Sequence, residues 1–342
     1  MGGQINFGGL EMNKKINWLL VGAGDIANKR VAPALRDAVN SNLLALCEPD
    51  AERRQTMAAT FGIQKVYETL DEALGNIEID AVYLATPVKF HVPQAIAALE
   101  AKKSVLVEKP LGLDSQEVSK LIKIAAQSGK LAGCSYYRRA SNRFAIAKAM
   151  IKAGELGTIV GGNMTYYSSF APKAGDQKYW RVQKSQSGGG PLSDMATHMF
   201  DFLIGLAGMP KSVSAICSNT LYDWEVEESS GMVLTLDNGA PVTASFAWNA
   251  GCWRHEFELV GSKGRLTMSP FDSGDLTYAS GRVVKSVPAP EVENVHLPLI
   301  QNFVDALNDD AELLVPLEEA LKTNLVLDAV YRSSNSHKME GL

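Results

Sequence analysis

The chain has 342 residues, which is long for one domain and comfortable for two. Apolar residues make up 46% of it and charged residues 21%, with a net charge of −5, as in an ordinary globular protein. Acids and bases are interspersed, and no apolar run reaches the roughly 18 residues of a membrane span. We therefore expect neither a nucleic-acid partner nor a membrane partner.

The cysteines and the start of the chain bear on where the protein works. The four cysteines are widely spaced and form no C-x-x-C pair, which predicts reduced thiols in a cytoplasmic protein rather than a disulfide or zinc framework: Cys47, Cys134, Cys217 and Cys252. Residues 1–11 lack the basic start and apolar core of a signal peptide. We expect them to form a disordered leader, with Met12 as a more natural start.

Short apolar runs alternate with helical stretches between residues 12 and 135. Strands are predicted at 16–21, 43–47, 81–85, 104–107 and 131–134, and helices at 26–38, 51–61, 70–74, 92–101 and 115–128. Asp50 and Asp114 are placed to cap helix starts, and Gly62 and Gly129 to end helices. Alternation of strand and helix predicts a Rossmann domain with a doubly wound parallel sheet.

The pattern changes beyond residue 153 to longer runs in which apolar and polar residues alternate. Strands are predicted at 159–167, 212–219, 232–237, 242–248, 255–260, 265–268 and 276–278, and helices at 192–207, 298–307 and 317–334. Tight turns such as Asp237-Asn238-Gly239 separate several strands. The chain is therefore expected to be an α/β protein whose residues 136–342 form a second α/β domain with a large, mostly antiparallel, open-faced sheet.

The first predicted strand runs into Gly22-Ala23-Gly24-Asp25-Ile26-Ala27, a G-x-G-x-x-A dinucleotide fingerprint. Gly22 permits the tight turn, Gly24 lets the backbone approach a pyrophosphate, and Ala27 allows the helix to pack closely on the strand. The helix start, which includes Asp25 and Ile26, offers N–H donors and a positive dipole end to phosphates. Because the motif follows a strand and opens a helix, we interpret it as a cofactor site rather than an unliganded turn.

Glu48 ends the second predicted strand, just over twenty residues after the glycines, where an acid binds the adenine ribose hydroxyls. A 2′-phosphate about 4 Å from this carboxylate would suffer roughly 4 kcal/mol of repulsion per charge at an effective dielectric near 20. NAD is therefore favoured over NADP. Arg53 and Arg54 could instead fold onto a 2′-phosphate, although they also suit a solvated helix start.

The later strand ends should meet the same crevice, because ligands bind at the carboxyl ends of parallel strands. Thr86-Pro87 should approach the ribose or nicotinamide, with His91 as a further candidate contact. Glu108-Lys109-Pro110 ends the next strand, which places the lysine beside a bound nicotinamide. Arg138 follows the last strand and is a further candidate for the cofactor site.

A second dense motif runs from Ser187 to His198, with three glycines and Pro191 before a predicted helix. Asp194 and His198 lie four residues apart on that helix and therefore share a face. A carboxylate that orients an imidazole is a familiar general base. The plain alternative is a surface pair of little energetic weight.

Oxidation of an alcohol by NAD requires the hydroxyl proton to leave as the hydride moves. With an ordinary pKa near 6.5, His198 is mostly neutral at neutral pH, whereas Lys109, with an ordinary pKa near 10.4, would become neutral only at a cost of roughly 4 kcal/mol. We assign proton transfer to His198, held by Asp194, with Lys109 as electrostatic partner or co-base. The residues leave open which of the two is the base.

Metal chemistry is the competing hypothesis. The chain has five histidines, no H-E-x-x-H motif and no cysteine cluster, so we expect no metal site, although Asp194, His198 and a distant third ligand could form one. Two aromatic-basic segments are candidates for stacking on a sugar-like substrate or for packing within the sheet: Tyr179-Trp180-Arg181 and Trp253-Arg254-His255.

Taken in order, these residues resemble the glucose–fructose oxidoreductase, inositol dehydrogenase and rhizopine-catabolism (Gfo/Idh/MocA) oxidoreductase family. The resemblance covers residues 14–336. Ala196 stands where the family usually has glycine, and Glu48 where it more often has aspartate. The resemblance rests on Gly22-x-Gly24-x-x-Ala27, Glu48, Thr86-Pro87, Glu108-Lys109-Pro110, Tyr137-Arg138, Trp180-Arg181 and Gly189-Gly190-Pro191-Leu192-x-Asp194-x-x-x-His198.

The resemblance implies catalytic roles for Lys109, Asp194 and His198, and places Trp180 and Arg181 at the cofactor. It also implies a dinucleotide-binding domain over residues 12–135, and a domain over residues 136–342 that binds substrate and forms a homodimer or homotetramer through its sheet. We expect an NAD-dependent dehydrogenase that oxidises a secondary hydroxyl of a sugar, inositol or related polyol. The alternatives are a redox-neutral enzyme, glycosidase-like or internally oxidoreductive, with tightly bound NAD, and a non-enzymatic sugar sensor. The proton-handling residues argue against the sensor.

Overall fold

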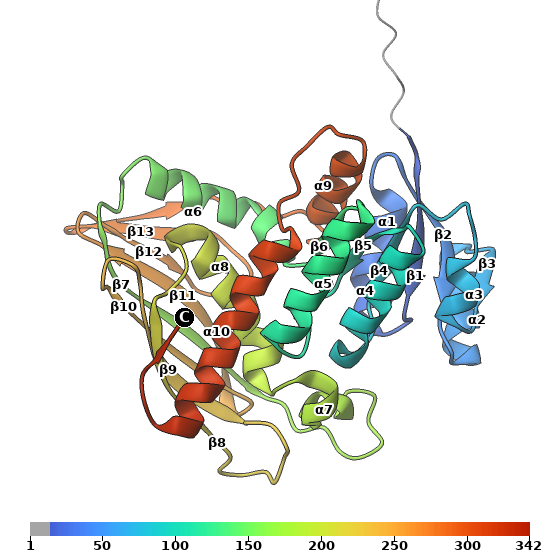
Figure 1. Cartoon of the computed structure of the whole chain (residues 1–342). Coiled ribbons are helices and arrows are strands. Elements are labelled where there is room, and N and C mark those ends of the chain that lie inside the picture. Colours follow the sequence, from blue (N-terminus) through green and yellow to red (C-terminus); the bar gives the residue numbers. More distant parts are fainter. Residues whose placement is uncertain (1–13) are drawn as a thin grey trace, which may run out of the picture.

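The computed structural model describes residues 14–342. The predicted leader over residues 1–11, and Met12, lie outside the described residues. Figure 1 shows two sheets side by side, with helix α10 (Leu317–Ser336) running between them. This helix contacts helix α5 (Ser115–Ser128) of the first sheet and strand β8 (Ser212–Ser218) of the second, so that it joins the two parts of the molecule.

The first sheet has six strands in the order β3-β2-β1-β4-β5-β6, and every pair is parallel. This order is that of the doubly wound dinucleotide-binding fold, as the sequence predicted. The short strand β3 was missed because none of its three residues is buried, Val66 is exposed, and so short a segment shows no clear period. The strands are β1 (Ile16–Val21), β2 (Ser41–Cys47), β3 (Lys65–Tyr67), β4 (Ala81–Leu84), β5 (Ser104–Val107) and β6 (Ala132–Cys134).

Helices cover both faces of this sheet, and local signals set their limits. The side chains of Asp50 and Asp114 accept backbone N–H bonds at two helix starts, and Gly62 and Gly129 end the same helices in the left-handed conformation, as predicted. A π-helical turn, Ala27–Val31, precedes the first helix. The helices that follow are α1 (Ala32–Asp37), α2 (Ala51–Phe61), α3 (Leu70–Leu74), α4 (His91–Glu100) and α5.

The second sheet has nine strands in the order β14-β13-β12-β11-β7-β10-β9-β8-β15. Strands β7 and β10 pair in parallel and the other pairs are antiparallel, which confirms the predicted mostly antiparallel sheet. Besides β8 the strands are β7 (Ile159–Ser169), β9 (Ser229–Thr235), β10 (Pro241–Ala247), β11 (Asn249–Gly261), β12 (Arg265–Met268), β13 (Leu276–Ser280), β14 (Val283–Val287) and β15 (Glu340–Gly341).

One face of the second sheet is buried beneath helices, and the other is open. The helices are α6 (Asn142–Lys152), α8 (Thr197–Ala207) and α10, whose apolar side chains form one core with the sheet. On the other face Val160, Ile216 and Val233 are exposed. A short helix α7 (Lys184–Ser187) lies in the segment that leads to α8.

Helix α9 (Leu297–Leu307) returns the chain to the first sheet. Its Phe303 ring lies 5.5 Å from the ring of Trp18 on β1, and Ile300 and Val304 belong to the same buried cluster. Residues nearly 300 positions apart thus form one core.

The register of the first sheet determines where the site is. Val21 pairs with Leu84, Leu84 with Val107, and Val107 with Cys134. The four strands therefore end level with one another. The polar residues that follow them, including Glu108 and Ser135, emerge along one edge of the sheet.

Candidate active site

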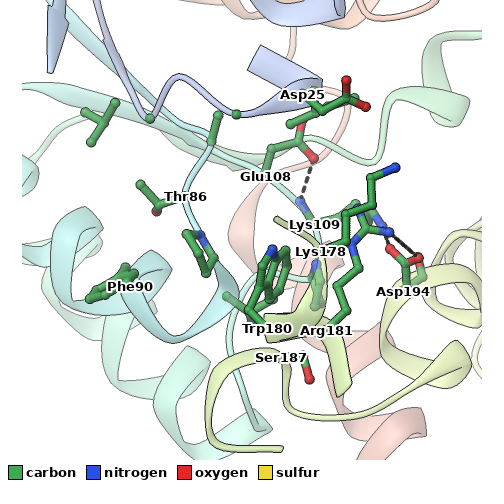
Figure 2. Close-up of a pocket in the computed structure, with 18 of the residues that line it drawn as sticks. Asp25, Thr86, Phe90, Glu108, Lys109, Lys178, Trp180, Arg181, Ser187 and Asp194 are labelled. Carbon is green, nitrogen blue, oxygen red and sulfur yellow. Dashed lines mark hydrogen bonds and ion pairs between the residues drawn. The ribbon is translucent and has the colours of Figure 1, made fainter. Parts of the chain in front are cut away.

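A cleft of about 620 Å³ opens along this edge, between the first sheet and the segments that lead into the second. Figure 2 shows Asp25 of the glycine turn on one side of it and Trp180 and Asp194 of the second part on the other. Most of the predicted site residues line this cleft: Gly22, Gly24, Asp25, Ile26, Glu48, Thr86, Pro87, Glu108, Lys109, Trp180, Arg181, Asp194 and His198.

The two glycines of the fingerprint have different physical roles. Gly22 has a φ of +96°, and a Cβ there would lie 2.8 Å from the carbonyl oxygen of Ala85. Only glycine tolerates both the conformation and the contact. A Cβ on Gly24 would meet no atom within 4 Å, because this residue faces the cleft. The turn thus leaves its backbone open to a ligand, as a dinucleotide pyrophosphate requires, while Ala27 is fully buried behind it.

Glu48 braces this turn. Its Oε2 accepts a hydrogen bond of 2.7 Å from Ala23 N–H, and its Oε1 accepts one of 3.0 Å from Asp50 N–H. Glu48 also lines the cleft, together with Glu68 and Arg53. Arg54 instead donates to the backbone carbonyls of Glu48 and Pro49, and its guanidinium lies 3.8 Å from Glu68 Oε2. The residues present therefore fit a dinucleotide, with two carboxylates and one guanidinium at the end where its adenosine would lie.

Lys109 and Arg181 both bind Asp194 (Figure 2). The Lys109 ammonium lies 3.2 Å from Oδ1 and donates a 2.6 Å hydrogen bond to the backbone carbonyl of Asp194. Arg181 donates a bond of 2.8 Å to Oδ2. Burial opposes the charge on Asp194, but the positive charges of Arg181 and Lys109 outweigh it and hold the pKa of this carboxyl below its usual value.

The expected pairing of Asp194 with His198 is wrong. Both carboxylate oxygens of Asp194 are taken by Lys109 and Arg181, and the buried Nδ1 of His198 has no hydrogen-bond partner among residues 14–342. The spacing places the two residues on one continuous helical segment, but Asp194 lies in the π-helical turn Leu192–Ala196, and its carboxylate is held between Lys109 and Arg181. Single π turns of this kind are frequent at functional sites.

His198 lies in an environment that keeps it neutral. Its side chain is buried, and the edges of the Tyr136 and Tyr137 rings pack against it at centroid distances of 6.3 and 5.3 Å. Burial, followed by the positive charges of Lys109 and Arg138, lowers the pKa of His198 well below its ordinary value. The imidazole can therefore exchange hydrogen bonds with a ligand but is a weak proton acceptor.

Two predicted cofactor contacts do not line the cleft. His91 is buried, and its ring nitrogens each lie 2.8 Å from a backbone carbonyl, those of Pro110 and Thr86, so it holds two loops together. Arg138 is buried, with its guanidinium 5.1 Å from the centre of the Tyr137 ring and 4.8 Å from that of Phe271. Both side chains were placed in the site because they follow strand ends, but the chain turns them into the core.

Trp253, Arg254 and His255 also lie away from the cleft, on β11. Trp253 is 61% exposed, Arg254 pairs with Glu256 at 2.6 Å, and the buried His255 lies 3.5 Å from Asp272. None of the three lines the cleft, and only His255 packs within the sheet. Tyr179-Trp180-Arg181, in contrast, forms a 3-10 turn at the cleft.

Several residues that line the cleft were not predicted from the sequence, among them His296 and Trp248. His296, just before α9, is buried; its ring stacks on Tyr137 at 4.3 Å, and its Nε2 lies 3.5 Å from Glu108 Oε1. Glu108 also accepts a 2.7 Å bond from the Tyr83 hydroxyl. Trp248 follows β10 and lines the same cleft. Neither His296 nor Trp248 belongs to a recognisable sequence motif, because the tertiary packing brings each of them to the cleft.

Residues 14–342 contain no group of three or more histidine, cysteine or carboxylate side chains placed to hold a metal ion. The four cysteines are all free. Within the same residues, no helix combines the length and the apolar character needed to cross a membrane.

A dinucleotide fingerprint and a paired set of ionisable groups in one cleft define a dinucleotide-dependent oxidoreductase. Residues 16–136 match the model of an oxidoreductase family with an NAD-binding Rossmann fold, and residues 144–267 match that of the GFO/IDH/MocA C-terminal domain. The chain belongs to the Gfo/Idh/MocA family. It is an NAD(P)-dependent oxidoreductase acting on CH–OH groups, as the sequence predicted.

Individual relatives are distant in sequence but similar in length. "Oxidoreductase P35" of Formosa agariphila is 24% identical over 322 residues, covering 93% of this chain and 98% of its own. The scyllo-inositol 2-dehydrogenase (NADP(+)) IolW of Bacillus subtilis is 26% identical over 312 residues, covering 84% and 85%. The structure of the aldose-aldose oxidoreductase from Caulobacter crescentus, complexed with glycerol, superposes with a TM-score of 0.88 at 24% identity, covering 96% of this chain and 100% of that one. This likeness supports the fold.

Proposed function

We propose that the protein is an NAD-dependent dehydrogenase that oxidises a secondary hydroxyl of a sugar, inositol or related polyol. One observation carries the proposal: Lys109 from the first sheet and His198 from helix α8 line the same cleft as the glycine turn and Glu48. Residues 12–135 would bind the dinucleotide, and residues 136–342 would supply the substrate side. The relative named a scyllo-inositol dehydrogenase suggests a cyclic polyol as the substrate class.

In this reaction the carbinol carbon loses a hydride and its hydroxyl loses a proton, which leaves a ketone. A bound nicotinamide supplies the hydride acceptor. The proton must leave through the protein, and the surroundings of Lys109 and His198 favour the lysine. Lys109 would accept the proton as the neutral amine, and Asp194 would then give the resulting ammonium a counter-charge. The buried Nδ1 of His198 has no such partner among the described residues, and nearby cations oppose protonation of its ring. This reverses the assignment made from the sequence.

His198 then serves to position the substrate instead of accepting its proton. As a neutral imidazole it can donate a hydrogen bond to the substrate oxygen and fix the position of the carbinol carbon. Arg181 holds the other oxygen of Asp194, so the carboxylate is fixed on both sides.

The proposed cofactor is NAD rather than NADP. At the end of the cleft where the adenosine would lie, Glu48 and Glu68 oppose a 2′-phosphate, although Glu68 lies 3.8 Å from Arg54, and Arg53 could favour it. Arg54 is occupied by backbone carbonyls. Membership of the family does not decide between NAD and NADP, since one relative is named an NADP(+) enzyme.

Purified protein, incubated with NAD+ or NADP+ and single members of a panel of inositols, sugars and sugar acids, tests the proposal through the absorbance of the reduced nicotinamide. We expect one structural class of polyol to support turnover with NAD+. Protein that purifies with its dinucleotide bound, and that oxidises one sugar only while reducing another, would instead establish the redox-neutral alternative. Absence of both reactions would refute the proposal.

A further inference from the structure

The loop that leads into the helix of Asp194 and His198 is packed against a side chain and a backbone carbonyl from outside the cleft. A Cβ on Gly189 would overlap the Tyr331 hydroxyl, and one on Gly190 would overlap the backbone carbonyl of Glu227. The glycines of this motif therefore allow close approach of other parts of the protein, not only of a ligand. Tyr331 comes from α10, and Glu227 from the loop between β8 and β9.

Glu227 is bound on both oxygens. Its Oε1 accepts hydrogen bonds from Gly190 N–H at 3.0 Å and Leu192 N–H at 3.1 Å. Its Oε2 accepts one of 3.0 Å from the Tyr331 hydroxyl. The first N–H groups of a helix have no partners within the helix, and a negative charge there is favourable. A buried carboxylate that satisfies two of them fixes the start of the helix in position and direction.

A short chain of hydrogen bonds links this carboxylate to the reacting groups. Gly190 donates to Glu227, and the carbonyl of Gly190 accepts a bond of 3.1 Å from Asp194 N–H. Asp194 then binds Lys109 across the cleft. Glu227 and Tyr331 do not line the cleft, and they reach it only through the backbone of the glycine loop.

We propose that Glu227 and Tyr331 form a clamp, the Glu227 clamp, that positions Asp194 and His198 for catalysis. Both are positioning residues, since they act through the backbone of residues 190–194. The proposal rests on the proposed function, because it assumes that Asp194 and His198 serve the reaction. A displacement of about 1 Å in a reacting group can reduce turnover about 100-fold.

The test compares Glu227→Ala with Glu227→Gln and Tyr331→Phe. Glutamine keeps an acceptor for both N–H groups and a polar partner for the Tyr331 hydroxyl, so it should rescue what alanine loses. For Glu227→Ala we expect kcat to fall about 100-fold while the KM for NAD+ stays within about threefold, because the glycine turn and Glu48 are untouched. Glu227→Gln should stay within about fivefold of wild type, and Tyr331→Phe within about tenfold. Equal losses in Glu227→Gln and Glu227→Ala, or full activity in Glu227→Ala, would overturn the clamp.

Hydrogen exchange measured by mass spectrometry gives a readout that needs no substrate. Peptides that span residues 186–200 should exchange faster in Glu227→Ala than in wild type and at the wild-type rate in Glu227→Gln, while peptides of β1 stay unchanged. Unchanged exchange in Glu227→Ala would refute the clamp even if no polyol were ever turned over. If the exchange pattern is as expected but no polyol is oxidised, the result would count against the proposed function and not against the clamp.

A second pair of variants tests the close contact between Gly189 and Tyr331, and it remains informative if Glu227→Ala does not fold. Gly189→Ala should destabilise the protein, because its Cβ would overlap the Tyr331 hydroxyl. In the double variant Gly189→Ala/Tyr331→Phe the hydroxyl is absent, and the atom nearest to the new Cβ at position 189 is the ring carbon Cζ of residue 331, at 3.0 Å. Part of the lost stability should therefore return. A double variant less stable than Gly189→Ala would contradict the proposed contact.

Discussion

Replacement of Lys109 tests most directly whether this residue serves the proton transfer or only the binding of the cofactor. Its ammonium lies 3.2 Å from Asp194 Oδ1, and the Lys109 and Asp194 side chains are 14% and 19% exposed. At an effective dielectric near 20 the attraction is at most about 5 kcal/mol, before solvent screening reduces it. Removal of the ammonium takes away this counter-charge and the group that we propose carries the proton.

We expect Lys109→Ala to lower kcat by about 10²- to 10⁴-fold, which corresponds to about 3–5 kcal/mol of transition-state stabilisation. Affinity for the reduced cofactor, measured by fluorescence titration with NADH, should change little, because Lys109 holds neither the glycine turn nor Glu48. Lys120→Ala, at an exposed lysine on α5, serves as the matched control. Turnover by Lys109→Ala within threefold of wild type would refute the reasoning.

Lys109→Arg then distinguishes proton transfer from simple electrostatics. Arginine keeps the positive charge but cannot be deprotonated in a protein. If Lys109 carries the proton, Lys109→Arg should be as inactive as Lys109→Ala. Activity of Lys109→Arg within tenfold of wild type would show that the charge alone suffices and would return the base to His198.

Three further predictions follow from the same structure. Glu48→Ala should weaken NAD binding and narrow the preference over NADP, since it removes both a negative charge and the brace on Ala23; an unchanged ratio of the two kcat/KM values would contradict this. Because the pKa of His198 is lowered in the folded protein, the unfolded chain binds more protons below about pH 6.5, so stability should fall with acidification below that value and rise as pH increases toward it. Thermal melts of His198→Asn should show a weaker dependence on pH, and an equal dependence would remove His198 as its cause. Light scattering should show a homodimer or homotetramer that Ile216→Lys, on the open sheet face, dissociates; a wild-type monomer at micromolar concentration would exclude that interface.

The features that could be predicted from the sequence depend on interactions between residues that are close together in the chain. The strand Ile16–Val21, the helix caps at Asp50 and Asp114 and the left-handed ends at Gly62 and Gly129 all depend on residues within a few positions of one another. The same holds for the turn at Gly22, whose conformation excludes other residues. For this reason the doubly wound sheet and the place of the cofactor turn were predictable.

Tertiary structure alone decided which side chains meet. The spacing of Asp194 and His198 showed a shared helix but not that Lys109, 85 residues earlier, would take the carboxylate. In the same way nothing near His296 indicated that it would stack on Tyr137, and nothing near Arg138 that Phe271 would draw it into the core. Contacts of this kind depend on how whole sheets and helices pack, and the free energy of a buried charge is set by partners that are distant in the chain. Local sequence thus specified the elements and the chemistry available, and their packing selected which groups face one another across the cleft.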